Sequence, residues 1–368
     1  MITPIFRTMT RSIPAILGLL SAASYGGMGY FEVGEPDDWY RDRVATDPSM
    51  GPVSLGVIPS DLYDVRGVGD SAWTHPGGAD GRLSEPPLPR MAGALARADS
   101  DRKIFRGHLN FINWESVVGE HCDSIRGVEY YFLSHPDALA QAIAHGFNLF
   151  SLSNNHARDC DLGRATTNST PRPGPLMTAE AMARLKAETP IPFLWAGVGA
   201  RAPETNPYLA KVERFEIEGR SVRVAFAAVA LLGWDIPGAA TFDYRSLPGA
   251  QVRKTLESLR TAEADLRVLS IHTQDGSNSR KEDGAFIALK SISEDFVRNY
   301  GGDIVFGQGP HTWGGVRVIE KSDGRRGVVF TSLGNFLHQG LGSNRDNYLG
   351  RALFDRDSLR LREVQVYP

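Results

Sequence analysis

This chain of 368 residues has few cysteines, no excess of positive charge and no long apolar run. Its only two cysteines, Cys122 and Cys160, can build neither a multi-cysteine zinc site nor a disulfide framework. The formal net charge is −3, so no basic excess indicates nucleic acid or an anionic membrane surface as a partner. No apolar run reaches the length of a membrane span.

Two features bear on where the protein works. The cysteines could form a single disulfide in an oxidising compartment, but we favour two buried thiols. Near the N-terminus, Arg7 and Arg11 precede residues 13–24, an apolar run with small residues at its end, which is typical of a secretory signal. The alternative is a buried first element of the domain. A cytoplasmic and an exported location both stay open, with membrane association only through the N-terminus.

The rest of the composition is that of an ordinary globular protein, with 42% apolar and 23% charged residues. Residues 1–50 are predicted to be an N-terminal segment that includes an irregular lead-in, and residues 51–368 a single catalytic domain. Strands alternate with helices in the middle of the chain, and hairpins follow, which predicts an α/β fold. Residues 178–188 form a predicted helix with Thr178 as its N-cap, and residues 332–336 a predicted loop.

One stretch, residues 147–163, combines a short apolar run with side chains that bind metals or move protons. Residues 148–152 have the length and character of a buried strand. Ligands of α/β proteins sit just beyond the carboxyl ends of such strands. The alternative is a polar loop in which Asn and Asp form turns. The polar side chains that follow this strand are Asn154, Asn155, His156 and Asp159.

Potential metal ligands follow four other predicted strands as well. The chain has nine histidines, and three of them come just after apolar runs. Carboxylate, amide and imidazole groups together suit divalent Mn, Fe or Zn, and a carboxylate can bridge two such ions. The residues concerned are Asp70, Glu115, Asn155, His156, His272 and, in the turn at 307–311, His311.

The order of these motifs resembles the bacterial capsule synthesis CapA family, which includes the poly-γ-glutamate synthesis protein PgsA. That family is related to the calcineurin-like metallophosphoesterases. The motifs that carry the resemblance are Gly69-Asp70, Asn113-Trp114-Glu115, Asn154-Asn155-His156 with Asp159, His272, Gly307-Gln308-Gly309-Pro310-His311 and Ser332-Leu333-Gly334-Asn335-Phe336.

The resemblance implies a four-layer α-β-β-α sandwich with two mixed sheets, as in metallophosphoesterases, and a cofactor of one or two divalent ions of Mn, Fe, Zn or Mg. Asp70 and His311 would hold one ion, and Glu115 would bridge to a second. Asn155 and His272 would hold that second ion. His156 would donate a proton to the leaving group, with Asp159 orienting it.

The chain departs from the family pattern around the second ion. Gln308 replaces the first histidine of Gly-His-x-Pro-His, and Thr273 follows His272 where the family has Trp-Gly. A glutamine oxygen can bind a hard cation, but less strongly than imidazole binds a transition metal. Gln308 is therefore a weakened candidate ligand, and a single or loosely held ion is an alternative to a pair.

The implied activity is that of a metal-dependent hydrolase, phosphoesterase-like or amidase-like, in capsule polysaccharide or poly-γ-glutamate synthesis. Its substrate would be an acidic polymer or a phosphate-containing compound, and other capsule-assembly proteins would be its partners. Two alternative functions are of a different kind. One is a non-catalytic polymer-binding component with a degraded metal site, and the other is a cytoplasmic relative recruited to small-molecule metabolism.

Overall fold

The computed structural model describes residues 30–31, 43–45, 55–73, 88–100, 103–120, 132–161, 173–199, 206–247, 249–274, 284–338 and 347–367. The apolar run at 13–24 and Cys122 lie outside these ranges. Among the described residues, no helix combines the length and the apolar character needed to cross a bilayer.

The first of two large mixed sheets contains eight strands. They are β1 (Tyr30–Phe31), β9 (Lys211–Ile217), β10 (Arg220–Leu232), β11 (Thr241–Asp243), β12 (Leu266–Thr273), β13 (Ile304–Gln308), β14 (Val316–Glu320) and β15 (Arg326–Phe330). Their order is β1-β14-β15-β13-β12-β10-β11, with β9 paired to β10. The hairpins that were predicted to follow the alternating strands and helices are present as β9–β10 and β14–β15.

The second sheet also contains eight strands. They are β2 (Arg43–Ala45), β3 (Leu62–Ala72), β4 (Leu109–Trp114), β7 (Leu149–Ser151), β8 (Leu194–Ala196), β16 (Asn335–His338), β17 (Leu349–Asp355) and β18 (Leu361–Tyr367). Their order is β2-β18-β17-β3-β4-β7-β8, with β16 paired to β3. A separate pair joins β5 (Val117–Val118) to β6 (Leu133–Ser134).

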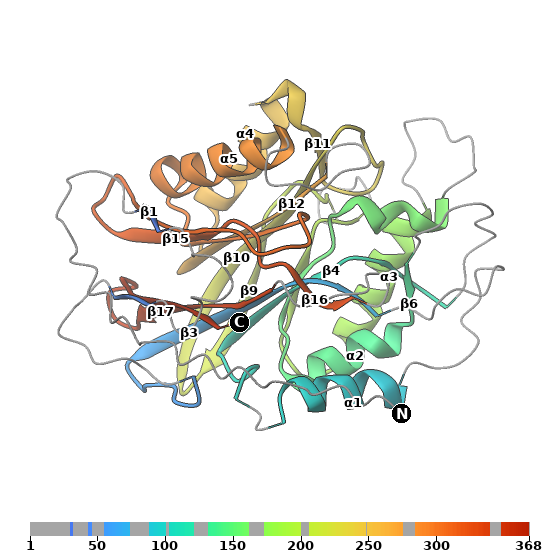
Figure 1. Cartoon of the computed structure of the whole chain (residues 1–368), viewed down its shortest axis with the longest axis horizontal. Coiled ribbons are helices and arrows are strands. Elements are labelled where there is room, and N and C mark those ends of the chain that lie inside the picture. Colours follow the sequence, from blue (N-terminus) through green and yellow to red (C-terminus); the bar gives the residue numbers. More distant parts are fainter. Residues whose placement is uncertain are drawn as a thin grey trace, which may run out of the picture.

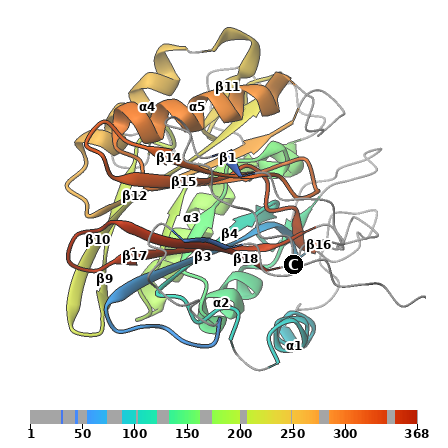
Figure 2. The ribbon, with the colours of Figure 1, turned by 60° about the vertical axis from the view of Figure 1, so that its left-hand side comes forward.

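Helices cover the outer faces of both sheets (Figures 1 and 2). The helices are α1 (Leu88–Ala98), α2 (Pro136–His145), α3 (Pro173–Glu188), α4 (Ala250–Thr261) and α5 (Gly284–Tyr300). One apolar core lies between the sheets, a second lies under α1, α2 and α3, and a third lies under α4 and α5. The predicted four-layer α-β-β-α sandwich with two mixed sheets is therefore confirmed.

Strand β10 shows why the sheets stack in this way. Phe226 and Ala228 face the second sheet, whereas Ala227 and Val229 face α4 and α5. Because successive side chains of a strand point to opposite faces, a strand buried on both sides needs an almost continuous apolar run. The sequence of β10 supplies such a run, and the strand lies inside its sheet between β11 and β12.

Helix α3 begins earlier than predicted. Its first residue is Pro173, and Thr178 lies inside the helix instead of capping it. The Thr178 hydroxyl donates to the Gly174 carbonyl and accepts from the Val118 backbone N–H. Pro173 and Pro175 belong to the first turn, where the backbone nitrogens need no intrahelical partner, so the prolines do not end the helix.

Lys211, at the start of β9, bears a buried amine. Burial lowers the pKa of Lys211 to about 7, although the Trp195 ring, whose centroid is 3.0 Å from Nζ, favours the charged form. Between pH 7 and about 10, the unfolded chain holds a proton that the folded chain has released, so wild-type stability rises with pH. We expect Lys211→Met to stabilise the protein by about 2 kcal/mol at pH 7, because it removes this burial cost.

The gain should shrink as the pH rises towards 10, which denaturant unfolding at several pH values would measure. Lys254→Met, on the exposed face of α4, is the matched control and should change stability little at any of these pH values. A loss of stability in Lys211→Met at pH 7 would mean that the contact with Trp195 outweighs the cost of burial.

Candidate metal centre

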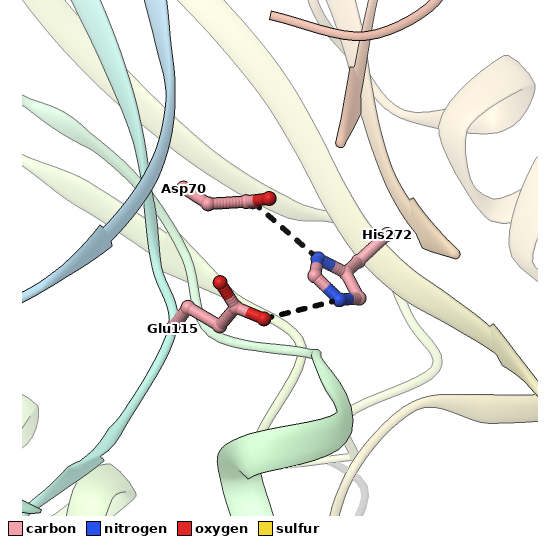
Figure 3. A group of neighbouring side chains, drawn as sticks. All are labelled: Asp70, Glu115 and His272. Atoms are coloured by element: carbon pink, nitrogen blue, oxygen red, sulfur yellow. Dashed lines mark ion pairs between the residues drawn. The ribbon is translucent and has the colours of Figure 1, made fainter. Parts of the chain in front are cut away.

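The candidate site lies where parallel strands of the two sheets end. Strands β3 and β4 are parallel neighbours in one sheet, and β12 and β13 are parallel neighbours in the other. Side chains at the carboxyl ends of parallel strands gather at one edge of a sheet. Asp70, Glu115 and His272 come from these ends and face one another in the interior (Figure 3).

A β-bulge directs Asp70 towards the site. Val65 and Gly67 of β3 face the first sheet, so strict alternation would point Asp70 to the opposite side. The register of β3 against β4 shifts between Val68 and Asp70, and such an irregularity reverses the alternation. The side chain of Asp70 is consequently fully buried among the other candidate ligands.

Gly69 permits a close approach between β3 and the segment that precedes β16. A Cβ atom on Gly69 would lie only 1.8 Å from the Gly334 carbonyl oxygen. The Asp70 N–H donates to this same carbonyl at 2.9 Å, and Gly334 has a φ of 74°, which glycine adopts without strain. The predicted loop at 332–336 is partly wrong, because strand β16 begins at Asn335. β16 pairs with the last part of β3, after the part of β3 that pairs with β17.

Asn113 and Glu115 share one side of the chain at the end of β4. They are two residues apart, so both point towards the first sheet, and both are fully buried. The Asn113 amide nitrogen donates to Asp70 Oδ1 at 2.7 Å and lies 3.3 Å from His272 Nδ1. Asn113 thus links the carboxylate of one sheet to the imidazole of the other.

His272 faces both buried carboxylates, with one ring nitrogen towards each, as Figure 3 shows. Its Nδ1 is 3.5 Å from Asp70 Oδ1, and its Nε2 is 3.5 Å from Glu115 Oε1. The same Nε2 is 2.7 Å from the side-chain oxygen of Asn155. His272 is therefore the side chain around which the carboxylates and the amide are arranged.

The polar stretch after β7 forms a short 3-10 helix, η2 (Asn155–Asp161). A 3-10 helix has three residues per turn, so His156 and Asp159 lie on the same side. His156 Nδ1 is 2.7 Å from Asp159 Oδ2, and His156 Nε2 is 4.0 Å from Glu115 Oε1. The backbone N–H of Phe132 donates to the same Asp159 oxygen at 2.6 Å. Asp159 thereby fixes the ring of His156 beside the carboxylate group.

His311 completes the cluster from the turn after β13. Its Nδ1 is 3.2 Å from Asp70 Oδ2 and 4.0 Å from Glu115 Oε2. The residue has a φ of 56°, which is unusual for a side chain other than glycine. Asn335 holds it there, because the Asn335 side-chain oxygen is 2.8 Å from His311 Nδ1.

We expect Asn335→Ala to weaken metal binding by about 10- to 100-fold, the usual effect of removing a group that orients a ligand. Titration of the metal-free protein with Mn²⁺ would measure the affinity. Asn299→Ala, on α5, removes an asparagine remote from the site and should leave the affinity unchanged. Equal affinity in Asn335→Ala and the wild type would show that His311 needs no such support.

The side chain of Gln308 points into a polar layer beneath His272. Its amide nitrogen donates to the Phe306 carbonyl at 2.8 Å, and its oxygen accepts from the Ser270 hydroxyl at 3.2 Å. Ser270 also lies 2.9 Å from the Ser151 hydroxyl of the other sheet. The structure therefore gives Gln308 hydrogen bonds below the cluster, although its Cα is the register partner of His272.

We expect Gln308→His to tighten metal binding by roughly tenfold. An imidazole at this position lies beside His272 on the neighbouring strand and is within reach of the cluster. The metal content, measured by elemental analysis, and the hydrolase activity should rise together. If neither changes, position 308 does not contribute to the metal centre.

Opposite charges stabilise one another across the cluster. Burial pushes the pKa of Asp70 upwards, but hydrogen bonds and positive charge from His272 and His311 bring it well below the usual value. Burial likewise opposes charge on His311, yet Glu115 and Asp70 raise its pKa to about 10. A pocket that draws a proton onto His311 in this way also attracts a metal cation, whose binding would release that proton.

The pKa of His156, which is bonded to Asp159, is raised by nearby carboxylates in the same way. Burial opposes charge on His156, but the carboxylates of Asp159 and Glu115 raise its pKa above the ordinary value. We assign the proton between His156 Nδ1 and Asp159 Oδ2 to His156. The Phe132 N–H also donates to Asp159, and this hydrogen bond favours the anionic form of the carboxylate. His156 therefore stays protonated to a higher pH than an ordinary histidine, which suits a proton donor.

The donor set fits a divalent cation. One ligand atom each from Asp70, Glu115 and His272 lies within 4.8 Å of the others, and all three residues are buried. Carboxylate oxygens and imidazole nitrogens are the donors that divalent Mn, Fe and Zn bind in proteins. The Asn113 side-chain oxygen is buried without a hydrogen-bond partner in the described part of the chain, which leaves another hard donor nearby.

Two results differ from what the sequence indicated. Cys160 is disulfide-bonded, so the expectation of buried thiols is wrong. Cys122, the only other cysteine of the chain, lies outside the described residues. Asn113 and Asn335 both contact the cluster, although neither was among the predicted ligands. Their place inside the motifs Asn-Trp-Glu and Ser-Leu-Gly-Asn-Phe was the available signal.

Comparison with known proteins gives one family match. Residues 80–172 match the family described as "Bacterial capsule synthesis protein PGA_cap". No curated protein matches the chain. The matched span contains the candidate-site residues Asn113, Glu115, Asn155, His156 and Asp159.

Similar solved structures are distant. A hypothetical protein from Thermus thermophilus is 15% identical with a TM-score of 0.44, and the alignment covers 83% of this chain and 98% of that one. A 5'-nucleotidase from Candida albicans is 12% identical with a TM-score of 0.36, covering 82% of this chain and 50% of that one.

Proposed function

We propose that this chain, a relative of the bacterial capsule synthesis proteins over residues 80–172, is a metal-dependent hydrolase of phosphoesters. The observation that carries the proposal is the position of His156. One ring nitrogen is bonded to Asp159, and the other is 4.0 Å from Glu115 in the candidate metal cluster. A proton donor beside a group of metal ligands is the arrangement that ester hydrolysis requires.

Asp70, Glu115 and His272 would hold the ion, with Asn155 and His311 at its sides. A bound divalent ion supplies positive charge that stabilises the phosphoryl oxygens and activates water. Asn113 fixes Asp70 relative to His272 through its amide nitrogen. The surrounding strands bury these groups, and burial strengthens their interactions with a charged substrate.

His156 would protonate the leaving oxygen. Its pKa is raised above the ordinary value, against the effect of burial, by Asp159 and Glu115, so the protonated form persists to a higher pH than in an ordinary histidine. Asp159 keeps the ring oriented through Nδ1, which leaves Nε2 to face the cluster. Asp159 is in this sense a positioning residue for His156.

The substrate class follows from the family match. We propose an acidic polymer, or a phosphate-containing intermediate of its synthesis, in capsule or poly-γ-glutamate production, with other capsule-assembly proteins as partners. Hydrolysis of a γ-glutamyl amide uses the same proton donor and is tested beside the ester.

The test combines metal analysis with two assays in added Mn²⁺. Bis(p-nitrophenyl) phosphate reports phosphodiester hydrolysis, and γ-glutamyl p-nitroanilide reports amide hydrolysis. We expect bound metal and release of p-nitrophenol, both lost in Asp70→Asn and retained in Asp357→Asn, an exposed control. Release of p-nitroaniline alone would make the protein an amidase. Bound metal without either activity would favour a binding component of the capsule assembly.

A further inference from the structure

Arg158 and Trp234 form a pair beside the metal centre that the proposed hydrolysis does not use. Arg158 belongs to η2 and follows His156 by two residues. Its guanidinium carbon lies 5.0 Å from the centroid of the Trp234 ring. Both side chains are only partly buried, so the pair is partly accessible from solvent.

The period of η2 places Arg158 on the side that faces the cluster. Residues three apart in a 3-10 helix lie above one another, about 6 Å apart along the axis. The contact of His156 with Asp159 shows that this period holds in η2. Asn155, which contacts His272 at 2.7 Å, stands in the same relation to Arg158. Arg158 therefore continues the side of η2 that reaches the cluster.

Trp234 approaches from the same edge of the first sheet. Ala230 of β10 is the register partner of His272 in β12. The strand runs on to Leu232, and Trp234 follows after a single residue, Gly233. The indole thus stands beyond the level of His272 in the direction in which both strands end.

The chemistry of the pair favours an oxyanion. A guanidinium carries its charge at any physiological pH and can donate two parallel hydrogen bonds to a phosphate or a carboxylate. Stacking on an indole restricts the rotation of the arginine side chain and lowers the entropy cost of binding. A lysine at the same position would lack the planar fork.

We propose that Arg158, held against Trp234, binds a second anionic group of the substrate, a few bonds away from the bond that is hydrolysed. The inference rests on the proposed function for the reacting centre, and it adds a specificity: the substrate carries an oxyanion besides the one that reacts. A phosphodiester without a second anion binds only the metal centre.

Two synthetic esters that differ in one carboxylate test the specificity. Methyl p-nitrophenyl phosphate lacks a second anion, and 2-carboxyethyl p-nitrophenyl phosphate carries one. We expect Arg158→Gln to lower kcat/KM for the carboxyethyl ester by about 10- to 100-fold, mainly through KM, as for a charged hydrogen bond. The methyl ester should change by less than about twofold. For the carboxyethyl ester, Arg158→Lys should have a kcat/KM between those of the wild type and Arg158→Gln. Arg184→Gln on α3 is the matched control and should behave as the wild type does.

An equal loss for both esters, or a loss of bound metal in Arg158→Gln, would overturn the proposal, because Arg158 would then only support η2. No difference between Arg158→Gln and the wild type with the carboxyethyl ester would also overturn it.

Binding measurements separate this proposal from the hydrolase itself. In calorimetry of the Mn²⁺-loaded protein, Arg158→Gln should weaken the binding of pyrophosphate by at least about tenfold and the binding of phosphate by less than about twofold. A tri-γ-glutamate peptide in place of pyrophosphate shows whether carboxylates serve as the second anion. If Arg158→Gln weakens pyrophosphate binding in this way and the wild type shows no hydrolysis, the anion site stands and the hydrolase proposal fails. If the wild type hydrolyses esters and Arg158→Gln binds pyrophosphate as tightly as the wild type does, the hydrolase proposal stands and the anion site fails.

Discussion

Glu115→Gln is expected to remove bound metal and hydrolysis together. Glu115 is fully buried, and its oxygens lie 3.5 Å from His272, 4.0 Å from His156 and 4.0 Å from His311. The substitution keeps the shape of the side chain but replaces a carboxylate, a preferred ligand of divalent cations, with a neutral amide. Metal affinity should fall by more than about 100-fold, because groups that merely orient ligands already contribute 10- to 100-fold.

The measurement is thermal unfolding with chelator and with added Mn²⁺. The wild type should gain stability from the ion, since a ligand that binds only the folded state stabilises it. Glu115→Gln should show no such gain. Glu257→Gln, on the exposed surface of α4, should behave as the wild type does. A normal gain in Glu115→Gln would remove Glu115 from the set of ligands.

His156→Gln should lower kcat by about 10²- to 10⁴-fold for esters with a poor leaving group, without loss of metal. An alkoxide leaving group needs a proton, whereas p-nitrophenolate leaves without one. The effect on p-nitrophenyl esters should therefore be much smaller. The test is to measure the hydrolysis rates of two phosphodiesters that differ only in the leaving group, one an alkoxide and the other p-nitrophenolate. Each rate is measured in the wild type and in the variant.

The same residue determines how activity depends on pH. Because the pKa of His156 is raised, activity should persist at pH values above the ordinary pKa of histidine and should fall as the pH passes the raised pKa. Asp159→Asn removes the main charge that raises it, so the fall should move to lower pH. An unchanged profile in Asp159→Asn, or equal losses for both esters in His156→Gln, would exclude His156 as the proton donor.

Much of the site was predictable because its residues lie at strand ends. Short apolar runs followed by Glu115, Asn155 and His156 already indicate strands whose carboxyl ends carry polar side chains. The parallel arrangement then brings those ends together. In the structure, His272 contacts Asp70, Glu115 and Asn155, as expected of side chains that share one pocket.

The details that the sequence could not give depend on pairing between distant segments. The bulge that turns Asp70 inwards is a property of the register between β3 and β4. The support of His311 by Asn335 requires β16 to pair with β3, and nothing local in residues 332–336 specifies a strand there. The disulfide of Cys160 is a third case, because proximity in space cannot be inferred from two isolated cysteines.

The ends of the helices, unlike these details, depend on residues at the ends themselves. Pro136 and Gly146 mark the two ends of α2, where proline fits the first turn and Gly146 has a φ of 117°. Both signals can be read from the sequence itself. In α3, the predicted start at Thr178 lies five residues after the observed start at Pro173, because the prolines at the beginning of the helix are suited to a first turn.

Diffraction from crystals grown with Mn²⁺, recorded with wavelengths on both sides of the manganese edge, tests the central claim most directly. We predict an anomalous peak between the two sheets, at about 2.0–2.3 Å from carboxylate oxygens of Asp70 and Glu115 and from a nitrogen of His272. Absence of a peak there, or a peak held by other residues, would contradict the metal centre and the hydrolase built on it.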